Sequence, residues 1–171
     1  MNNMTIDIAT NALMVSIENP TLTLFSKIIA YAFEPTVLAI ISLFVATYLY
    51  LKISKKQGIF FVLTIFVTGI SIKILKEIIQ RARPINALMT ETSFSIPSGH
   101  ATIVLVFFGL IAYLFMNKKH KFATITTTTL IILLTGFTRI YLRVHWLTDV
   151  LAGFALGGLI LITGIFIYKK F

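Results

Sequence analysis

The sequence predicts an all-α fold, a multi-pass transmembrane helical bundle of five spans (or six on a second interpretation of the N-terminal region) with an N-terminal interfacial helix. The chain has 171 residues, of which 57% are hydrophobic and 12% are charged, whereas a soluble domain carries about 25% charged residues. The apolar residues also come in long blocks, and a helix needs roughly 20 such residues to cross the hydrocarbon core. The chain contains no cysteine, which excludes disulfides, thiolate metal sites and cysteine nucleophiles.

Five apolar stretches qualify as transmembrane helices. They lie near 34–50, 59–79, 101–116, 122–141 and 150–168. The sequence has no internal repeat and no low-complexity segment, so we expect a single membrane-embedded domain over residues 1–171. Within it, residues 34–171 would form the transmembrane core and residues 1–33 an N-terminal interfacial segment.

The first 33 residues lack a clear span. Residues 1–19 contain Asp7, Asn11 and Glu18, and their apolar run is too short to cross a membrane. They also lack the positively charged start and the small-residue cleavage site of a signal peptide. Residues 21–33 are apolar at helical spacing, with Lys27 among them. This segment is interpreted as a helix lying in the membrane interface, and a sixth span is the alternative.

The net charge of +9 has two possible explanations. In a soluble protein it would suggest a nucleic-acid partner, but a chain this apolar has little water-exposed surface for a basic groove. Lysines that contact lipid headgroups are the better explanation. We therefore expect the lipid bilayer as partner, no nucleic acid, and no obligate protein partner.

The lysines outside the spans form three clusters that predict the orientation. These are Lys52, Lys55 and Lys56; Lys118, Lys119 and Lys121; and Lys169 and Lys170. Two predicted spans separate each cluster from the next, so all three fall on one face, which the positive-inside rule makes cytoplasmic. In a plasma membrane, the loops 80–97 and 142–148 would then be extracytoplasmic. All four arginines lie in or beside these loops, against the usual bias: Arg81, Arg83, Arg139 and Arg143.

A first group of candidate functional residues closes the second predicted span. Lys76 lies six residues before the pair Arg83-Pro84, and Lys73 lies one turn before Lys76. Ionisable residues at membrane depth are costly, and they are usually paired or functional. The structural alternative is that these lysines anchor a helix end by extending to the interface. That alternative is favoured for Lys73, whereas for Lys76 and Arg83 both explanations stay open.

A second group, Pro97-Ser98-Gly99-His100, directly precedes the third span. A helix that begins here would direct free backbone N–H groups and the positive end of its dipole toward the outer loops, which favours anion binding. Ser98 adds a hydroxyl donor, and Gly99 permits close approach of an anion to the main chain. An ordinary helix cap with an interfacial histidine is the alternative for this segment alone.

A third group joins the fourth and fifth spans. His145 and Asp149 are four residues apart, so in a helix they share one face. Asp149 could then accept a hydrogen bond from one ring nitrogen of His145 and leave the other as an unprotonated nucleophile. A salt-bridged helix start is the alternative. We expect Trp146 and Tyr141 to lie in the aromatic belt at the membrane surface.

Together the three groups supply a complete set for phosphoryl transfer on one predicted face. Lys76, Arg83 and Arg139 would neutralise the negative charge on the phosphoryl oxygens, and the Ser98–Gly99 turn would donate hydrogen bonds. We expect no metal and no other cofactor, because the cations take the place of a metal and the histidines and acids are scattered.

The catalytic roles in this hypothesis belong to three residues. His145 would attack the phosphorus, Asp149 would orient the His145 ring, and His100 would protonate the departing oxygen. Because His145 must be neutral and His100 protonated, a bell-shaped pH profile is expected.

The pattern resembles the three-part motif of the type 2 phosphatidic acid phosphatase superfamily. That motif reads Lys-x6-Arg-Pro, Pro-Ser-Gly-His and Ser-Arg-x5-His-x3-Asp. Its counterparts here are Lys76, Arg83-Pro84, Pro97-Ser98-Gly99-His100, Thr138-Arg139, His145 and Asp149, with threonine in place of the usual serine. The resemblance implies a helical membrane core, a phosphohistidine intermediate on His145, metal independence, and His100 acting first as acid and then as base.

The resemblance also implies a class of substrate. Compact membrane members of the family act on lipid phosphates, so the expected substrate is a membrane lipid phosphate or diphosphate: undecaprenyl diphosphate, phosphatidylglycerophosphate, phosphatidic acid or lipid A. Two alternatives use the same residues. One is a protein that binds or transports a phospholipid without cleaving it, and the other is a lipid phosphotransferase.

Overall fold

The computed structural model describes residues 3–170, and these residues are helical or irregular, without strands. The seven α-helices are α1 (Asn3–Ser16), α2 (Pro20–Ala32), α3 (Pro35–Tyr48), α4 (Lys55–Ile79), α5 (Gly99–Phe115), α6 (Lys121–Tyr141) and α7 (Leu147–Lys170). A π-helical turn (Leu49–Ile53) extends α3, and a 3-10 turn (Lys118–His120) precedes α6. The all-α prediction is confirmed.

The helices include four that are long and apolar enough to cross a membrane: Pro35–Ile53, Lys55–Ile79, Lys118–Tyr141 and Leu147–Lys170. α5, the third predicted span, is a shorter apolar helix of 17 residues. At 1.5 Å per residue it is about 26 Å long, slightly less than the roughly 30 Å hydrocarbon core. The five helices match the five predicted stretches.

α5 lies at the centre of the bundle and contacts α3, α4, α6 and α7. Its side chains Val104, Val106 and Leu110 are fully buried. The ring of Phe107 meets that of Phe61 on α4 edge-on, with the two centroids 5.8 Å apart. α5 is therefore a core helix enclosed by the other spans, which fixes the position of its N-terminus.

α5 and α7 approach each other most closely where α5 begins. A Cβ atom added to Gly153 would lie only 2.8 Å from the backbone oxygen of Ser98, and one added to Gly157 would lie 3.0 Å from that of Thr102. Glycine is needed at these positions because the two backbones are nearly in contact. This packing brings the start of α5 beside the first turns of α7.

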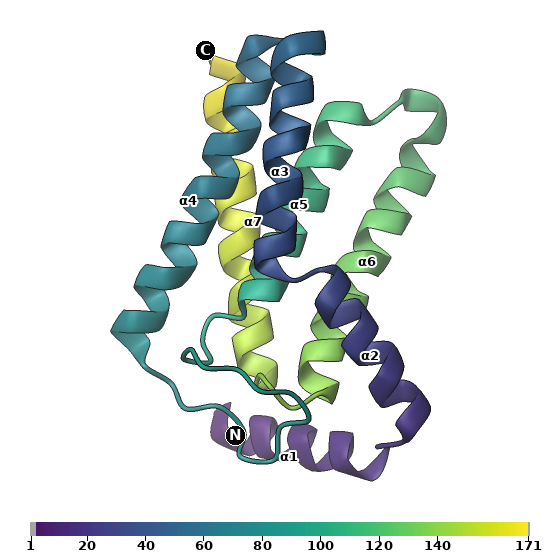
Figure 1. Ribbon diagram of the computed structural model, residues 1–171, viewed down its shortest axis with the longest axis vertical. Coiled ribbons are helices and arrows are strands. Elements are labelled where there is room, and N and C mark those ends of the chain that lie inside the picture. Colours follow the sequence, from purple (N-terminus) through teal and green to yellow (C-terminus); the bar gives the residue numbers. More distant parts are fainter. Residues whose placement is uncertain (1–2, 171) are drawn as a thin grey trace.

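The N-terminal region forms two helices in place of one. α1 lies across the end of the bundle where α4 ends and α7 begins, whereas α2 runs along α6 (Figure 1). The Asn19 side chain caps α2 by accepting a hydrogen bond from the N–H of Leu22 (2.9 Å). With 13 residues, α2 is shorter than a span, and its place in the membrane interface stays a prediction.

Tyr141 corrects one prediction. Its side chain is fully buried, and its hydroxyl lies 3.1 Å from the backbone nitrogen of Asn19 and 3.0 Å from the hydroxyl of Thr23. The prediction that Tyr141 lies in an aromatic belt was therefore wrong, because its hydroxyl is buried against hydrogen-bonding groups at the start of α2. Trp146 is partly exposed, and its assignment to the belt stays a prediction.

The two ends of the bundle carry different charged residues. The α3–α4 junction, the α5–α6 connection and the C-terminus lie at one end, with the three lysine clusters (Figure 1). The loop between α4 and α5, the α6–α7 turn and α1 lie at the opposite end, with the arginines. The predicted grouping of the loops is thus present in the fold.

Candidate active site

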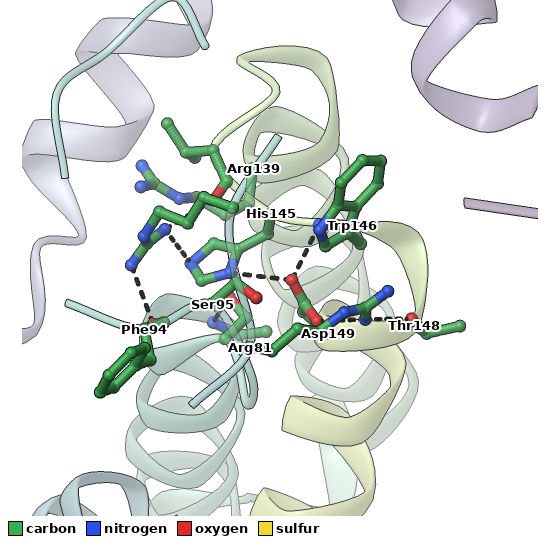
Figure 2. A network of polar contacts seen from close by, with 12 residues as sticks. Arg81, Phe94, Ser95, Arg139, His145, Trp146, Thr148 and Asp149 are labelled. Carbon is green, nitrogen blue, oxygen red and sulfur yellow. Dashed lines mark hydrogen bonds and ion pairs between the residues drawn. The ribbon is translucent and has the colours of Figure 1, made fainter. Parts of the chain in front are cut away.

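The three predicted groups of residues meet at the arginine end of the bundle. α4 ends at Ile79, and the left-handed backbone of the following residue, Gln80 (φ 50°), turns the chain so that Arg81 and Arg83 pass over the end of the helices. The N–H of Ser98 donates to the backbone oxygen of Asp149 (3.0 Å), which joins the start of α5 to α7. Figure 2 shows His145, Asp149 and Arg139 in this region.

Lys76 and Arg83 are held by the same short stretch of loop. The Lys76 ammonium donates to the Ser93 hydroxyl (2.9 Å) and to the Phe94 backbone oxygen (2.6 Å). Arg83 donates to the backbone oxygens of Ser93 (2.7 Å) and Val144 (2.5 Å). Burial lowers the pKa of Arg83 below its usual value, yet a guanidinium stays protonated at neutral pH. The loop therefore places two cations side by side.

Arg139 is the most deeply buried cation of the site, with no exposed side-chain surface. Its Nη2 donates to the Glu91 carboxylate, and the Arg83 Nη2 lies 3.8 Å from the other Glu91 oxygen. Within residues 3–170, the Nε and Nη1 of Arg139 have no hydrogen-bond partner. Buried donors without partners are rare and costly, and an anion bound here would supply the missing acceptors.

Glu91 was not predicted from the sequence. It belongs to an irregular loop, and an acid is not expected where phosphate should bind, so no local pattern identifies it. In the structure its carboxylate bridges Arg83 and Arg139. A carboxylate is itself an anion, so Glu91 occupies the kind of position that phosphoryl oxygens would take.

His145 lies between Asp149 and Arg83, with a side chain that is 2% exposed. Its Nδ1 is 3.6 Å from Asp149 Oδ2, longer than a hydrogen bond, and its Nε2 is 3.3 Å from Arg83 Nη1. A guanidinium can only donate, so Nε2 must be the acceptor and the ring proton belongs on Nδ1, facing Asp149. Burial lowers the pKa of His145 to about 4, and Arg83 and Arg139 act in the same direction. The imidazole is therefore neutral at physiological pH, and the lone pair of Nε2 faces Arg83.

Asp149 is held in place by the start of α7. His145 precedes the helix, which begins at Leu147. The Asp149 Oδ2 accepts from the N–H of Trp146 (2.9 Å), as the third residue of a helix does in a capping box. The predicted i,i+4 pairing is present, but the capping bond orients the carboxylate because the histidine itself is outside the helix.

His100 is buried at the start of α5, and its Nε2 lies 3.1 Å from the Ala30 backbone oxygen on α2. A carbonyl oxygen only accepts, so Nε2 carries a proton and Nδ1 is the nitrogen left for chemistry. Among the described residues, no hydrogen bond or ion pair joins His100 to the other predicted site residues. The structure therefore brings His145 and Asp149 together, while the catalytic roles of both residues and the participation of His100 stay predictions.

The small residues of the motifs have structural partners. The hydroxyl of Ser98 caps α5 by accepting from the N–H of Ala101 (3.4 Å), and the hydroxyl of Thr138 bonds to the Thr135 backbone oxygen (2.8 Å). A Cβ atom on Gly99 would meet only ordinary contacts at 3.8 Å. Phosphate binding by Ser98 and Gly99 stays a prediction.

Two further charged residues extend the site. The Arg81 guanidinium donates to Asp149 Oδ1 (2.6 Å) and to Asp7 Oδ2 on α1 (2.5 Å). Burial alone would lower the pKa of Arg81, but its contacts with Asp7 and Asp149 outweigh burial and raise it. The sequence offered Asp7 only as an argument against a span, and no spacing rule connects two residues this far apart in the chain.

A cavity of about 400 Å³ opens beside the cations, and it is lined by Arg83, Pro84, Ala87, Leu88, Met89, Thr90 and Glu91. A larger apolar groove of about 630 Å³ lies between α4 and α7 near Lys56 and Tyr168, at the lysine end, away from these side chains. The smaller cavity is the one that adjoins the candidate site. Within the described part of the chain, no three His, Asp or Glu side chains gather as a metal cage.

Buried cations thus surround a neutral histidine and a carboxylate at one end of a membrane-type helical bundle, and they form a candidate anion-binding site with a candidate nucleophile. The model of one family, the PAP2 superfamily, matches residues 57–171, and the chain belongs to this superfamily.

Known relatives agree with this assignment. The chain is 44% identical over 91 residues to phosphatidylglycerophosphatase B of Bacillus subtilis, covering 50% of this chain and 45% of that protein. It is 33% identical over 112 residues to lipid A 1-phosphatase of Rhizobium etli, covering 59% of this chain and 46% of that protein. The matches thus span about half the length of these curated relatives.

A solved structure resembles the whole fold. It is described as a transmembrane PAP2-type phosphatidylglycerolphosphate phosphatase from Bacillus subtilis. The TM-score is 0.89 at 31% sequence identity, and the alignment covers 98% of this chain and 86% of that one. The helical arrangement is therefore shared with a transmembrane member of the superfamily.

Proposed function

We propose that this protein is an integral-membrane phosphatase that hydrolyses a lipid phosphate or diphosphate through a phosphohistidine intermediate, without a metal. The observation that carries the proposal is the buried, neutral imidazole of His145, which lies between the Asp149 carboxylate and the Arg83 guanidinium. The phosphatase names of the relatives support the same chemistry.

In this proposal the phosphoryl group binds where Glu91 now contacts Arg83 and Arg139. Once the carboxylate is displaced, both guanidinium groups can donate to phosphoryl oxygens, and the two free donors of Arg139 gain partners. Lys76 lies next to Arg83 and adds a third positive charge. The start of α5 at Ser98 and Gly99 contributes backbone donors.

The first chemical step is attack by the lone pair of His145 Nε2 on phosphorus. The new P–N bond forms as the bond between phosphorus and the leaving oxygen breaks. Asp149 balances the positive charge that develops on the ring, since the proton on Nδ1 faces its carboxylate. The leaving oxygen takes a proton from His100.

The second step releases phosphate. His100, now neutral, accepts a proton from a water molecule, whose oxygen attacks phosphorus and displaces the imidazole of His145. Inorganic phosphate leaves, and both histidines return to their starting states. The reaction needs a lipid and water, and no protein partner enters it.

The proposed site faces the extracytoplasmic side of a plasma membrane, because the lysine clusters lie at the opposite end of the bundle. The candidate substrates are phosphatidylglycerophosphate, undecaprenyl diphosphate, phosphatidic acid and lipid A. The 44% identity to phosphatidylglycerophosphatase B makes phosphatidylglycerophosphate the first to test.

The test is phosphate release from phosphatidylglycerophosphate in detergent by the wild type and by His145→Ala. We expect the variant to fall below about a thousandth of the wild-type rate, because the nucleophile is removed. His120→Ala is the matched control, since His120 is exposed at the lysine end and should leave the rate unchanged. Release by His145→Ala near the wild-type rate would overturn the proposal.

The same assay separates the two alternatives. A wild-type protein that binds the lipid but releases no phosphate from any of the four candidates would be a binding or transport protein. Phosphate that appears on a second lipid in place of water would identify a phosphotransferase. Hydrolysis requires inorganic phosphate and dephosphorylated lipid in equal amounts.

A further inference from the structure

The N-terminal helix α1 places one carboxylate, Asp7, inside the bundle. The Asp7 side chain is 1% exposed, and both of its oxygens are engaged. Oδ1 accepts from the N–H of Thr148 (3.0 Å), and Oδ2 accepts from the Thr148 hydroxyl (2.6 Å) and from Arg81 (2.5 Å). A buried carboxylate is costly unless it is fully paired, so this contact fixes α1 against the start of α7.

Arg81 connects Asp7 to Asp149, the carboxylate beside the candidate nucleophile His145. Its Nη1 donates to Asp149 Oδ1 (2.6 Å) while its Nη2 donates to Asp7. The two oxygens of Asp149 therefore have different partners. Oδ1 accepts from Arg81, whereas Oδ2 accepts from the Trp146 N–H and faces His145. Figure 2 shows His145, Asp149, Arg81 and Thr148 in this sequence.

We propose that Asp7 and Arg81 are positioning residues for His145, which act by holding Asp149 and by setting the charge that Asp149 presents to the imidazole. This inference rests on the proposed function, because it assigns roles within the same site. It makes α1 part of the active site, although α1 contributes no group that touches phosphorus.

The geometry explains why two carboxylates and one arginine are needed. Without Arg81, Asp149 would lose its Oδ1 partner and could rotate away from the ring. Without Asp7, the whole charge of Arg81 would act on Asp149 and weaken the attraction between Asp149 and a positively charged imidazole. The alternation of charges from Asp7 to His145 holds Asp149 in place and leaves it enough negative charge to stabilise the ring during attack.

The charged and titratable groups of the site come from several elements. Arg83 and Glu91 lie on the α4–α5 loop with Arg81, Lys76 on α4, His100 on α5, Arg139 on α6, Asp149 on α7 and Asp7 on α1. Changes at Arg81 or Asp7 leave the charges of all the other groups unchanged. Their effects on the His145 titration therefore have signs that follow from charge alone.

Arg81→Gln removes a positive charge next to Asp149. The protonated form of His145 is then stabilised, so the acid limb of the rate profile should move up by roughly half a pH unit or more. Asp7→Asn removes a negative charge, so its acid limb should not rise. Arg81→Lys keeps the charge but loses the two-pronged geometry, so its limb should stay near that of the wild type.

A positioning role also predicts that kcat falls while KM changes little. All three variants should lose kcat by about tenfold or more, because Asp149 is misplaced, with KM changed by less than about threefold. A purely structural contact would lower the amount of folded protein and leave the acid limb of the remaining enzyme unmoved.

Glu18→Gln is the matched control. Glu18 also pairs with an arginine at this end of the bundle, Arg143 (2.7 Å), but neither residue contacts Asp149 or His145. We expect Glu18→Gln to keep the wild-type kcat and acid limb.

The experiment measures phosphate release against pH for the four variants, with size-exclusion profiles to establish folding. A shift of the acid limb to higher pH in Arg81→Gln, absent from Arg81→Lys and Glu18→Gln, supports the proposal. If His145→Ala is inactive but Arg81→Gln matches Glu18→Gln in kcat and limb, the positioning role is wrong and the proposed function stands. If Asp7→Asn does not fold, the two Arg81 variants decide the outcome by themselves.

Discussion

Glu91 gives the sharpest test of where phosphate binds. Its carboxylate contacts Arg139 and lies 3.8 Å from Arg83, so a phosphoryl group that uses both arginines must displace it. We predict that Glu91→Gln lowers KM for a lipid phosphate and tightens the binding of inorganic phosphate, because a neutral amide competes less well for the guanidinium groups.

The magnitude follows from the contact that must break. A hydrogen bond between charged groups contributes about 1.5–3 kcal/mol. The Glu91 side chain is 24% exposed, so water compensates part of the loss when the carboxylate swings out. We take the lower end, about 1.5 kcal/mol, which corresponds to slightly more than a tenfold decrease in KM.

The same substitution should destabilise the protein without ligand. Arg139 is fully buried, and without a counter-ion its guanidinium would cost about 1–3 kcal/mol of stability. Phosphate should restore that loss, since ligand at 100 times Kd adds about 2.7 kcal/mol. The assay is thermal unfolding in detergent with and without inorganic phosphate, alongside steady-state kinetics.

Glu77→Gln is the control, because Glu77 is an exposed acid on α4 next to Lys76 in the sequence. It changes net charge equally but should leave KM and the phosphate response unchanged. If Glu91→Gln has the wild-type KM and the wild-type response to phosphate, then Glu91 does not occupy the phosphate position and the binding geometry proposed above is wrong.

Three further predictions address the nucleophile, the packing and the metal. Because burial lowers the pKa of His145 to about 4 and only its neutral form attacks, kcat/KM should fall as pH drops through about 4; an acid limb near 6.5 in the pH profile would contradict this. Gly153→Ala should cost about 1–3 kcal/mol in denaturant unfolding and reduce activity, because its Cβ would lie 2.8 Å from the Ser98 oxygen. Gly158→Ala, with open space around its Cβ, should be tolerated in the same measurement. Dialysis against a chelator should leave phosphate release intact, and strict dependence on an added divalent cation would refute the metal-free mechanism.

The fold was largely predictable because membrane spans are encoded locally. A long run of apolar residues specifies a helix regardless of its neighbours, and the five predicted runs became α3 to α7, of which α5 is shorter than a full span. The N-terminal region was harder, because α1 and α2 are short and gain their positions from tertiary contacts. The hydrogen bond between the Tyr141 hydroxyl and the backbone N–H of Asn19, at the start of α2, is one such contact.

The site was predictable where its chemistry depends on short spacings. The spacing of four residues predicted the contact between His145 and Asp149, although His145 precedes the helix that the prediction assumed. The three motifs predicted that Lys76, Arg83 and Arg139 lie together, and in the structure Lys76 and Arg83 share Ser93 while Arg83 and Arg139 share Glu91. Asp7 pairs with Arg81 across 74 residues and Glu91 with Arg139 across 48 residues. Such pairs depend on how helices pack, and a single sequence contains no periodic signal for them.

The carboxylates that the sequence did not identify explain how a cationic site can exist before substrate arrives. Four buried or half-buried cations gather here, namely Lys76, Arg81, Arg83 and Arg139. Cations this close repel one another, and the site would be unstable without counter-ions. Asp7 and Asp149 are permanent partners because they are held by the start of α7, whereas Glu91 belongs to a loop and is partly exposed. When Glu91 is displaced, two positive charges are left uncompensated, which matches the charge of a phosphate monoester dianion. The loop acid therefore stabilises the empty site at a cost in substrate affinity, and this cost is the quantity that Glu91→Gln measures.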